Sequence, residues 1–239
     1  MMHTAMPQFA ELQLQFIWKT STPEAKGIIV ILLIFSVFAW FVMAYKGVQM
    51  RRAKKLNRFF DIEFRSQKTV FGVFDRSIEV EGCPLYTVYH AGCSELDSRM
   101  RRGAGAVRSS ATSLKSMEHV KRTLERVVAQ ESLRLESGLI LLALAVSGAP
   151  FLGLLGTVWG VMDAFAYVAA KGKADLATMA PGVAAALVTT VAGLMVAIPS
   201  MFGYNWLVHN LRVLTVELDN FAQELVSKME TEFLKDDDL

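Results

Sequence analysis

The sequence predicts an all-α integral membrane protein with three transmembrane helices. Three long runs carry almost no charge: residues 27–45 have none, residues 137–170 have only Asp163, and residues 176–208 have none. Each run is long enough to cross about 30 Å of hydrocarbon as a helix. Apolar residues make up 53% of the 239-residue chain, and the mean hydropathy is +0.34. Because this excess is concentrated in the three runs, it indicates a small membrane bundle.

The positions of the cations predict the orientation of the spans. Six cations follow the first run before any acid does: Lys46, Arg51, Arg52, Lys54, Lys55 and Arg58. Lys and Arg are enriched in the cytoplasmic connections of membrane proteins, so we expect residues 46–136 to lie in the cytoplasm. Residues 1–26 and the short connection 171–175 then lie outside, and residues 209–239 return to the cytoplasm. The N-terminus is therefore expected outside.

The cytoplasmic connection is expected to be helical. Over residues 51–80 the apolar residues recur mostly at steps of three and four, which is typical of a helix. Gly82 and Pro84 break this pattern, and a second helix is expected over residues 85–100.

A further apolar stripe begins at Ser113 and meets no glycine or proline before Gly138. It predicts a helix that continues unbroken into the second span. Residues 209–239 repeat the pattern as a helix that ends in an acidic tail. We interpret these stripes as packing surfaces within or between subunits.

Composition and motifs argue against catalysis, metal binding and nucleic-acid binding. The chain shows no catalytic triad, phosphate-binding loop or metal motif, so we do not expect an enzyme. Cys83, His90 and Cys93 are too few to complete a four-ligand zinc site. The net charge of +2 does not indicate a nucleic-acid partner, and the position of the basic cluster beside a span already explains it.

Small residues form a narrow face on each of the last two spans. On the second span they recur at steps of four, three and four: Ala149, Gly153, Gly156 and Gly160. On the third span they are Gly182, Ala186, Thr190, Gly193 and Ala197. Membrane helices associate largely through close packing of such residues, so we expect an antiparallel pair. Three prolines are expected as breaks or hinges in these helices: Pro150, Pro181 and Pro199.

Three polar residues of these spans are candidates for an ion pathway. Thr157 and Thr190 have an ordinary alternative role, because a threonine in a membrane helix often bonds to its own backbone. Asp163 is costly at membrane depth, where carboxylates usually mark an ion path, although it can also lie hydrated near the outer interface. At 100° per residue Asp163 returns to within about 20° of Gly156, whereas Thr157 lies about 120° from Asp163.

The same two spans carry a motif of specific order and spacing. It comprises APFLGLLGTVWGVM at 149–162 with Phe165, MAPGVAAAL at 179–187, Thr190, AIP at 197–199 and YN at 204–205. These residues resemble the MotA/TolQ/ExbB proton-channel family. Three spans favour its TolQ/ExbB branch, because flagellar MotA-type stators usually have four.

The resemblance implies a pentamer around a central pore in the bacterial inner membrane. The pore holds the single span of an ExbD/TolR-type partner, whose membrane aspartate carries the proton, and the threonines matching Thr157 and Thr190 face it. No cofactor is implied beyond the translocated ion, expected to be H⁺. The proton motive force then powers Tol-Pal-type envelope maintenance or TonB-type transport, through a TonB/TolA-type protein that spans the periplasm.

One residue departs from the family pattern. ExbB and TolQ usually have Pro-Gly-Ile-Ala-Glu-Ala-Leu on the third span, and here the glutamate position is Ala185. Asp163 could substitute for it, the aspartate of the partner could suffice, or the ion coupling could differ. An alternative from another class is a non-conducting membrane scaffold assembled through the small-residue faces, and a passive channel without a partner is a third.

Overall fold

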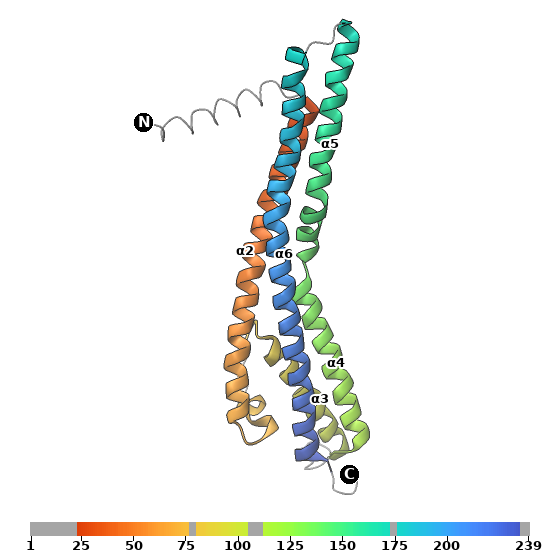
Figure 1. Ribbon diagram of the computed structural model, residues 1–239. Helices are drawn as coiled ribbons and strands as arrows, with labels where there is room; N and C mark the ends of the chain where they lie inside the picture. Colours follow the sequence, from red (N-terminus) through yellow and green to blue (C-terminus); the bar gives the residue numbers. More distant parts are fainter. Residues whose placement is uncertain (1–22, 77–79, 105–111, 173–175, 235–239) are drawn as a thin grey trace, which may run out of the picture. The chain divides into compact units, whose positions relative to one another are not determined.

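The computed structural model describes residues 23–76, 80–104, 112–172 and 176–234, and this part of the chain is almost entirely helical (Figure 1). The α-helices are α2 (Pro23–Ser66), α3 (Pro84–Ala104), α4 (Leu114–Glu136), α5 (Leu139–Lys171) and α6 (Leu176–Phe233), with the 3₁₀ turns η1 (Val70–Gly72) and η2 (Phe74–Arg76). Three of the helices, α2, α5 and α6, are long and apolar enough to cross a membrane. The expected all-α architecture with three spans is therefore confirmed. Most of the N-terminal segment, residues 173–175 of the 171–175 connection and the acidic tail lie outside the described residues.

The chain divides into two compact units, and α2 and α6 contribute to both. The first unit contains α2 as far as Ala44 and the chain from Gly138 to Trp206. The second unit contains the rest of α2 from Tyr45, the chain to Ser137, and α6 from Leu207 onward.

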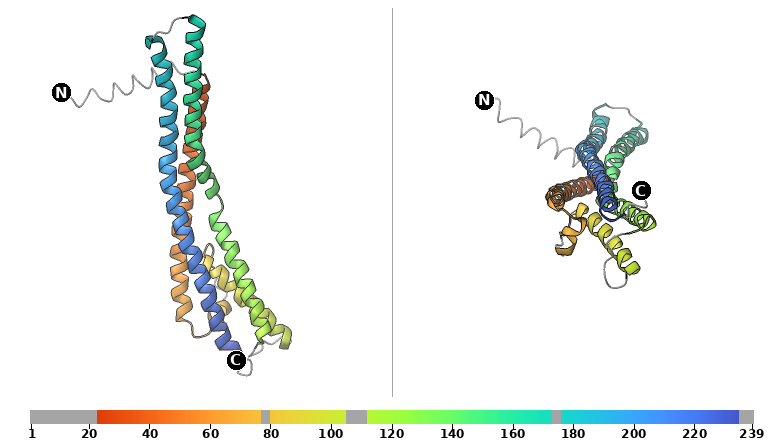
Figure 2. Two further views of the ribbon diagram at one scale, coloured as in Figure 1. Left: turned by 45° about the vertical axis from the view of Figure 1, so that its right-hand side comes forward. Right: turned by 90° about the horizontal axis from the view of Figure 1, so that it is seen from below.

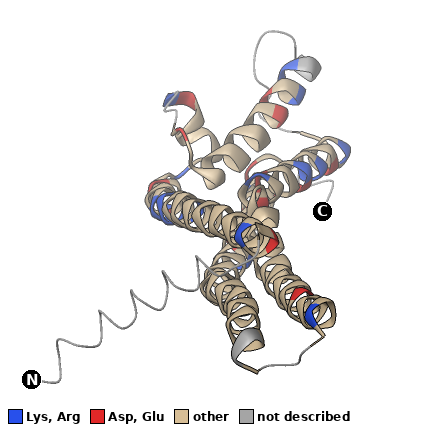
Figure 3. Ribbon diagram, turned by 90° about the horizontal axis from the view of Figure 1, so that it is seen from above, with Lys and Arg blue, Asp and Glu red and all other residues tan. Residues whose placement is uncertain are grey.

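In the first unit α5 and α6 run antiparallel side by side (Figure 2). Ile28 and Leu32 of α2 pack against Ala149 of α5 and Ala197 of α6. Many large apolar side chains of this unit point outward, as expected for helices that contact lipid. In Figure 3 these helices are almost wholly uncharged, and the charged residues of α5 are Asp163 and Lys171.

The expectation of one unbroken helix from Ser113 into the second span is wrong. Gly138 has φ +84°, a left-handed conformation that glycine adopts without steric cost. The Ser137 amide donates to Leu133 O at 2.9 Å, and the Lys46 ammonium donates to Leu135 O at 3.2 Å. These bonds satisfy the carbonyls at the end of α4, so the chain can start a new helix at Leu139.

The helix expected over residues 51–80 is also wrong beyond Ser66. The apolar spacing jumps there from Phe64 to Val70, and the chain turns through η1 and η2 instead of continuing. Tyr89 of α3 fixes this turn, because its hydroxyl donates to Val70 O at 2.7 Å and accepts from the Phe74 amide at 2.9 Å. A contact with a distant helix therefore overrides the local helical pattern.

Aromatic side chains from three helices form the centre of the second unit. The Phe64 ring lies 5.1 Å from the Phe221 ring and 5.6 Å from the Tyr89 ring, centroid to centroid. Around them the apolar stripes of α4 and α6 are buried, including Leu124 and Leu225. The stripes seen in the sequence thus pack within one chain.

Candidate functional site

The glycines of α5 form a groove that receives α6. Gly153, Gly156 and Gly160 are buried on one face of α5. A methyl group at Gly153 would lie 2.9 Å from Thr189 O, and one at Gly160 would lie 2.7 Å from the Ala186 Cβ. Because these distances are shorter than ordinary contacts, the close approach of the two helices depends on hydrogen as the side chain.

Gly193 makes the matching contact from α6. A Cβ placed there would lie 2.5 Å from Ala149 O and 3.2 Å from the Gly153 Cα. Gly182, near the other end of the pair, has more room, since its nearest neighbour would be the Ala164 Cβ at 3.5 Å. The closest approach of one backbone to the other therefore lies around Ala149, Gly153 and Gly193, whereas the space beside Gly156 is filled by the Thr189 side chain.

The two candidate threonines meet beside this contact. Thr157 of α5 and Thr190 of α6 are half-buried, and their Oγ1 atoms are 3.3 Å apart. Thr157 Oγ1 also lies 2.7 Å from Leu154 O, and Thr190 Oγ1 lies 3.0 Å from Gly153 O. Each hydroxyl has one proton to donate, so two protons serve three contacts. At any moment one of the three is not a hydrogen bond.

Thr189 is a residue that the sequence reasoning missed. Its side chain is fully buried, and its hydroxyl lies 2.6 Å from Ala186 O and 3.0 Å from Gly153 O. Thr189 is three residues after Ala186 and four before Gly193, and Thr190 is four after Ala186 and three before Gly193, so the spacing places both threonines near the same face without choosing between them. Its full burial gives it a structural role between α5 and α6.

Asp163 stands apart from the threonine pair. It is half-buried on α5, and among the described residues its carboxylate has no hydrogen-bond or ion-pair partner. Its neighbour Ala164, rather than Asp163 itself, faces Gly182. Ala185, at the position where the family has glutamate, is 3% exposed. The first unit thus offers two hydroxyls close together and a carboxylate that is not joined to them.

The three prolines lie inside helices that continue past them. Pro150 is within α5, and Pro181 and Pro199 are within α6; all three are half-buried. A proline inside a helix removes one backbone hydrogen bond. Pro150 directly follows Ala149, whose carbonyl faces Gly193, so the missing hydrogen bond lies where the two backbones are closest.

The cysteines of the second unit form no metal centre with the described residues around them. Cys83 and Cys93 are both buried, and Cys83 donates through its Sγ to Asn57 Oδ1 at 3.5 Å. Burial raises the pKa of the Cys83 thiol, which keeps it protonated. His90 is exposed and packs against the rings of Phe74 and Tyr86.

These features define a class of protein: a three-span helical membrane protein whose second and third spans pack through glycines beside a pair of hydroxyls. A sequence model of the MotA/TolQ/ExbB proton channel family matches residues 93–220, which include all of α5 and the whole apolar run of α6 at 176–208. The chain belongs to this family, as its motifs predicted.

Individual relatives agree over most of the chain. The biopolymer transport protein ExbB of Neisseria meningitidis serogroup A is 28% identical over 90% of this chain and 96% of its own length. The Tol-Pal system protein TolQ of Pseudomonas aeruginosa is 34% identical over 79% of this chain and 80% of its own. TolQ of Haemophilus influenzae is 31% identical over 91% of this chain and 94% of its own.

Proposed function

We propose that this chain is the channel-forming subunit of an ion-driven motor in the bacterial inner membrane. Five copies surround a pore, with the N-terminus in the periplasm and the second unit in the cytoplasm. The pore holds the span of an ExbD/TolR-type partner, whose aspartate carries a proton down the proton motive force. The observation that carries the proposal is the 3.3 Å contact between Thr157 and Thr190 on facing helices.

The threonine pair suits a proton path because its hydrogen bonds are exchangeable. Two protons serve three contacts, so a hydroxyl that turns toward a carboxylate or a water exchanges its bond to a carbonyl of α5 for the new one, Leu154 O for Thr157 and Gly153 O for Thr190. The third span has no carboxylate, because Ala185 occupies the position of the family's glutamate. The partner's aspartate is therefore the group that takes up and releases the proton, and Asp163 has at most an accessory role.

The names of the relatives indicate two processes that such a motor could power. Biopolymer transport and the Tol-Pal system both occur among them at similar identity. We propose that the motor energises an envelope or outer-membrane process of one of these two kinds, through a TonB/TolA-type protein.

A non-conducting scaffold is the second candidate, and one observation favours it. Both threonine hydroxyls already have a carbonyl of α5 as an acceptor, so helix packing alone can account for them. In that case the glycine groove only assembles the oligomer.

Two valine substitutions separate the two functions. Thr157→Val and Thr190→Val replace a hydroxyl by a methyl group of similar size. Thr231→Val is a matched control, since Thr231 of α6 also donates to a helix carbonyl, Ser227 O at 2.8 Å, but lies in the second unit. The chain is co-expressed with an ExbD/TolR-type protein of the same organism, purified and reconstituted into liposomes.

The motor predicts that a small single-span protein with a membrane aspartate co-purifies. It also predicts that the two span variants lower the proton flux at least about a hundredfold, the lower end of what one positioned proton-transfer group contributes. Their oligomeric mass is expected to match the wild type, and Thr231→Val is expected to conduct normally. Wild-type flux in both span variants would remove the threonines from the mechanism, and the absence of any partner would favour the scaffold.

A further inference from the structure

We propose that a cavity in the second unit binds a phosphate group carried by a small solute. The cavity has a volume of about 670 Å³ and lies between α2 and α6, with Leu85 of α3 in its wall. This volume is within the range of small-molecule sites, about 300–1,000 Å³. The site lies outside the first unit and does not depend on the proposed ion passage.

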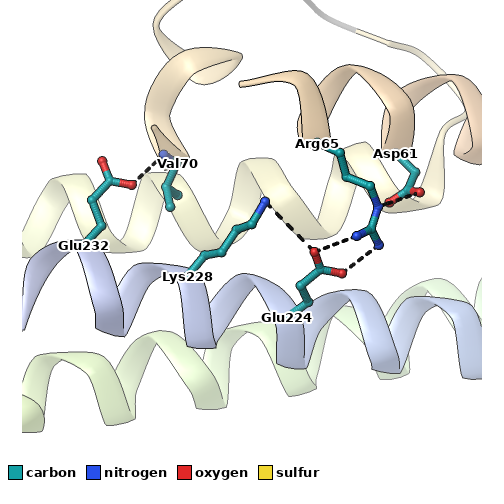
Figure 4. Close-up of polar contacts among 6 residues, drawn as sticks. All are labelled: Asp61, Arg65, Val70, Glu224, Lys228 and Glu232. Atoms are coloured by element: carbon teal, nitrogen blue, oxygen red, sulfur yellow. Dashed lines mark hydrogen bonds and ion pairs between the residues drawn. The ribbon is translucent and has the colours of Figure 1, made fainter. Parts of the chain in front are cut away.

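The walls of the cavity carry a surplus of positive charge. Five cations line it, Arg51, Lys54, Lys55, Arg58 and Arg65, against the three acids Asp61, Glu217 and Glu224. Two of these acids are already paired within the protein (Figure 4). Arg65 donates to Asp61 at 3.0 Å and to both carboxylate oxygens of Glu224 at 3.0 and 2.8 Å.

Lys228, which is not part of the cavity wall, lies 4.0 Å from Glu224 on the same face of α6 and gives this acid a second cationic partner (Figure 4). Because Asp61 and Glu224 are paired with Arg65, Glu217 is the one acid of the cavity wall left to balance the other cations. Lys54 and Arg58 are exposed and have no partner among the described residues. The remaining field in the cavity therefore favours an anion.

A buried amide in the wall supplies a donor without an acceptor. Asn57 is 2% exposed, and its Oδ1 accepts from the Leu85 amide at 3.2 Å and from Cys83 Sγ at 3.5 Å. These two donors fix which end of the amide is oxygen. The Nδ2 atom is buried and has no hydrogen-bond partner. A buried donor needs an acceptor, and phosphate oxygens accept strongly from amides, guanidinium groups and ammonium groups alike.

The distance along α2 favours a solute over a lipid headgroup. Asn57 lies about 18 Å beyond Tyr45, where the apolar run ends, at 1.5 Å per residue. The headgroup region extends only about 5–8 Å beyond the hydrocarbon on each side. A lipid phosphate would reach the first cations of the cavity but not Asn57 and Arg58.

Calorimetric titration of the full-length protein with sodium pyrophosphate, at constant ionic strength in detergent, tests the proposal. We expect saturable binding that Lys54→Gln and Arg58→Gln each weaken about tenfold, the loss of one charge-assisted contact. Asn57→Asp keeps the acceptor for the Leu85 amide but replaces the donor with a second oxygen, so we expect it to abolish binding. Lys121→Gln and Arg126→Gln remove exposed cations from α4 and are expected to leave the affinity unchanged.

Three results would overturn the inference. One is no saturable binding up to about 10 mM pyrophosphate. Another is equal weakening by the cavity variants and the α4 controls, which would indicate diffuse charge attraction. The third is variant-sensitive retention of phosphatidylglycerol over phosphatidylcholine without pyrophosphate binding, which would assign the cavity to a lipid. If Asn57→Asp fails to fold, the two exposed cation variants decide the question alone.

Discussion

Replacing Gly193 by alanine tests the packing of α5 against α6 where the two backbones approach most closely. The new Cβ would lie 2.5 Å from Ala149 O, whereas ordinary contacts begin near 3.4 Å. Since the obstacle is backbone, no side-chain rotation can relieve it. The two helices must therefore separate by about 0.9 Å at this level.

Three terms set the size of the effect. Overpacking of this kind costs about 1–3 kcal/mol. The separation also lengthens the Thr190 to Gly153 O bond, now 3.0 Å, and such bonds between membrane helices are worth about 0.6 kcal/mol. Alanine returns up to about 1 kcal/mol through its higher helix propensity. With the full propensity gain, we expect a net destabilisation of about 0.6–2.6 kcal/mol.

Gly148→Ala is the matched control, because a Cβ at Gly148 meets nothing within 4 Å. It carries the propensity gain without the overlap and is expected to be neutral or slightly stabilising. Thermal unfolding of both variants in the same detergent, followed by circular dichroism, gives the comparison. A Gly193→Ala protein as stable as Gly148→Ala would refute the close backbone contact.

Three further predictions concern other parts of the chain. Burial raises the pKa of Tyr89 above its ordinary value near 10. The contribution of this tyrosine to the stability of the fold is therefore complete below pH 10 and falls as the pH rises above 10. Thermal unfolding measured from pH 7 to 11 should show this fall in the wild type and not in Tyr89→Phe. Gly138→Ala places a side chain at φ +84° and is expected to cost about 1–2 kcal/mol in the same assay, whereas Gly138→Asn should cost less. Asp163→Asn is expected to keep proton flux within about twofold of the wild type, because the carboxylate is not joined to the threonine pair; a loss of tenfold or more would place it in the pathway.

The sequence predicted the fold where one physical signal dominates. The number of spans could be predicted from the long uncharged runs, because an apolar run of this length is typical of a helix that crosses the membrane. The two errors lie where tertiary contacts decide. The end of α2 at Ser66 depends on the Tyr89 hydroxyl, and the break at Gly138 depends on the Leu135 carbonyl, which the Lys46 ammonium of α2 satisfies. Neither contact can be read from local spacing.

The candidate site was predictable in part. Spacing brought the glycines of α5 to one face, and the structure places that face against α6. The relative position of Thr157 and Thr190 could not be derived, because it depends on the register between two helices. Spacing alone also could not choose Thr189 over Thr190 as the residue nearest the groove, since neighbours on a helix differ by only 100°.

The contact between Gly160 and Ala186 has a consequence for how related sequences vary. A methyl group at 160 would lie 2.7 Å from the methyl of Ala186, so there is room for one methyl group between the helices and not for two. Alanine at 160 should then be compatible with glycine at 186, and the double exchange Gly160→Ala with Ala186→Gly should restore what the first change alone removes. Substitutions at the two positions are expected to be correlated, and a larger residue on one helix should be accompanied by a smaller one on the other.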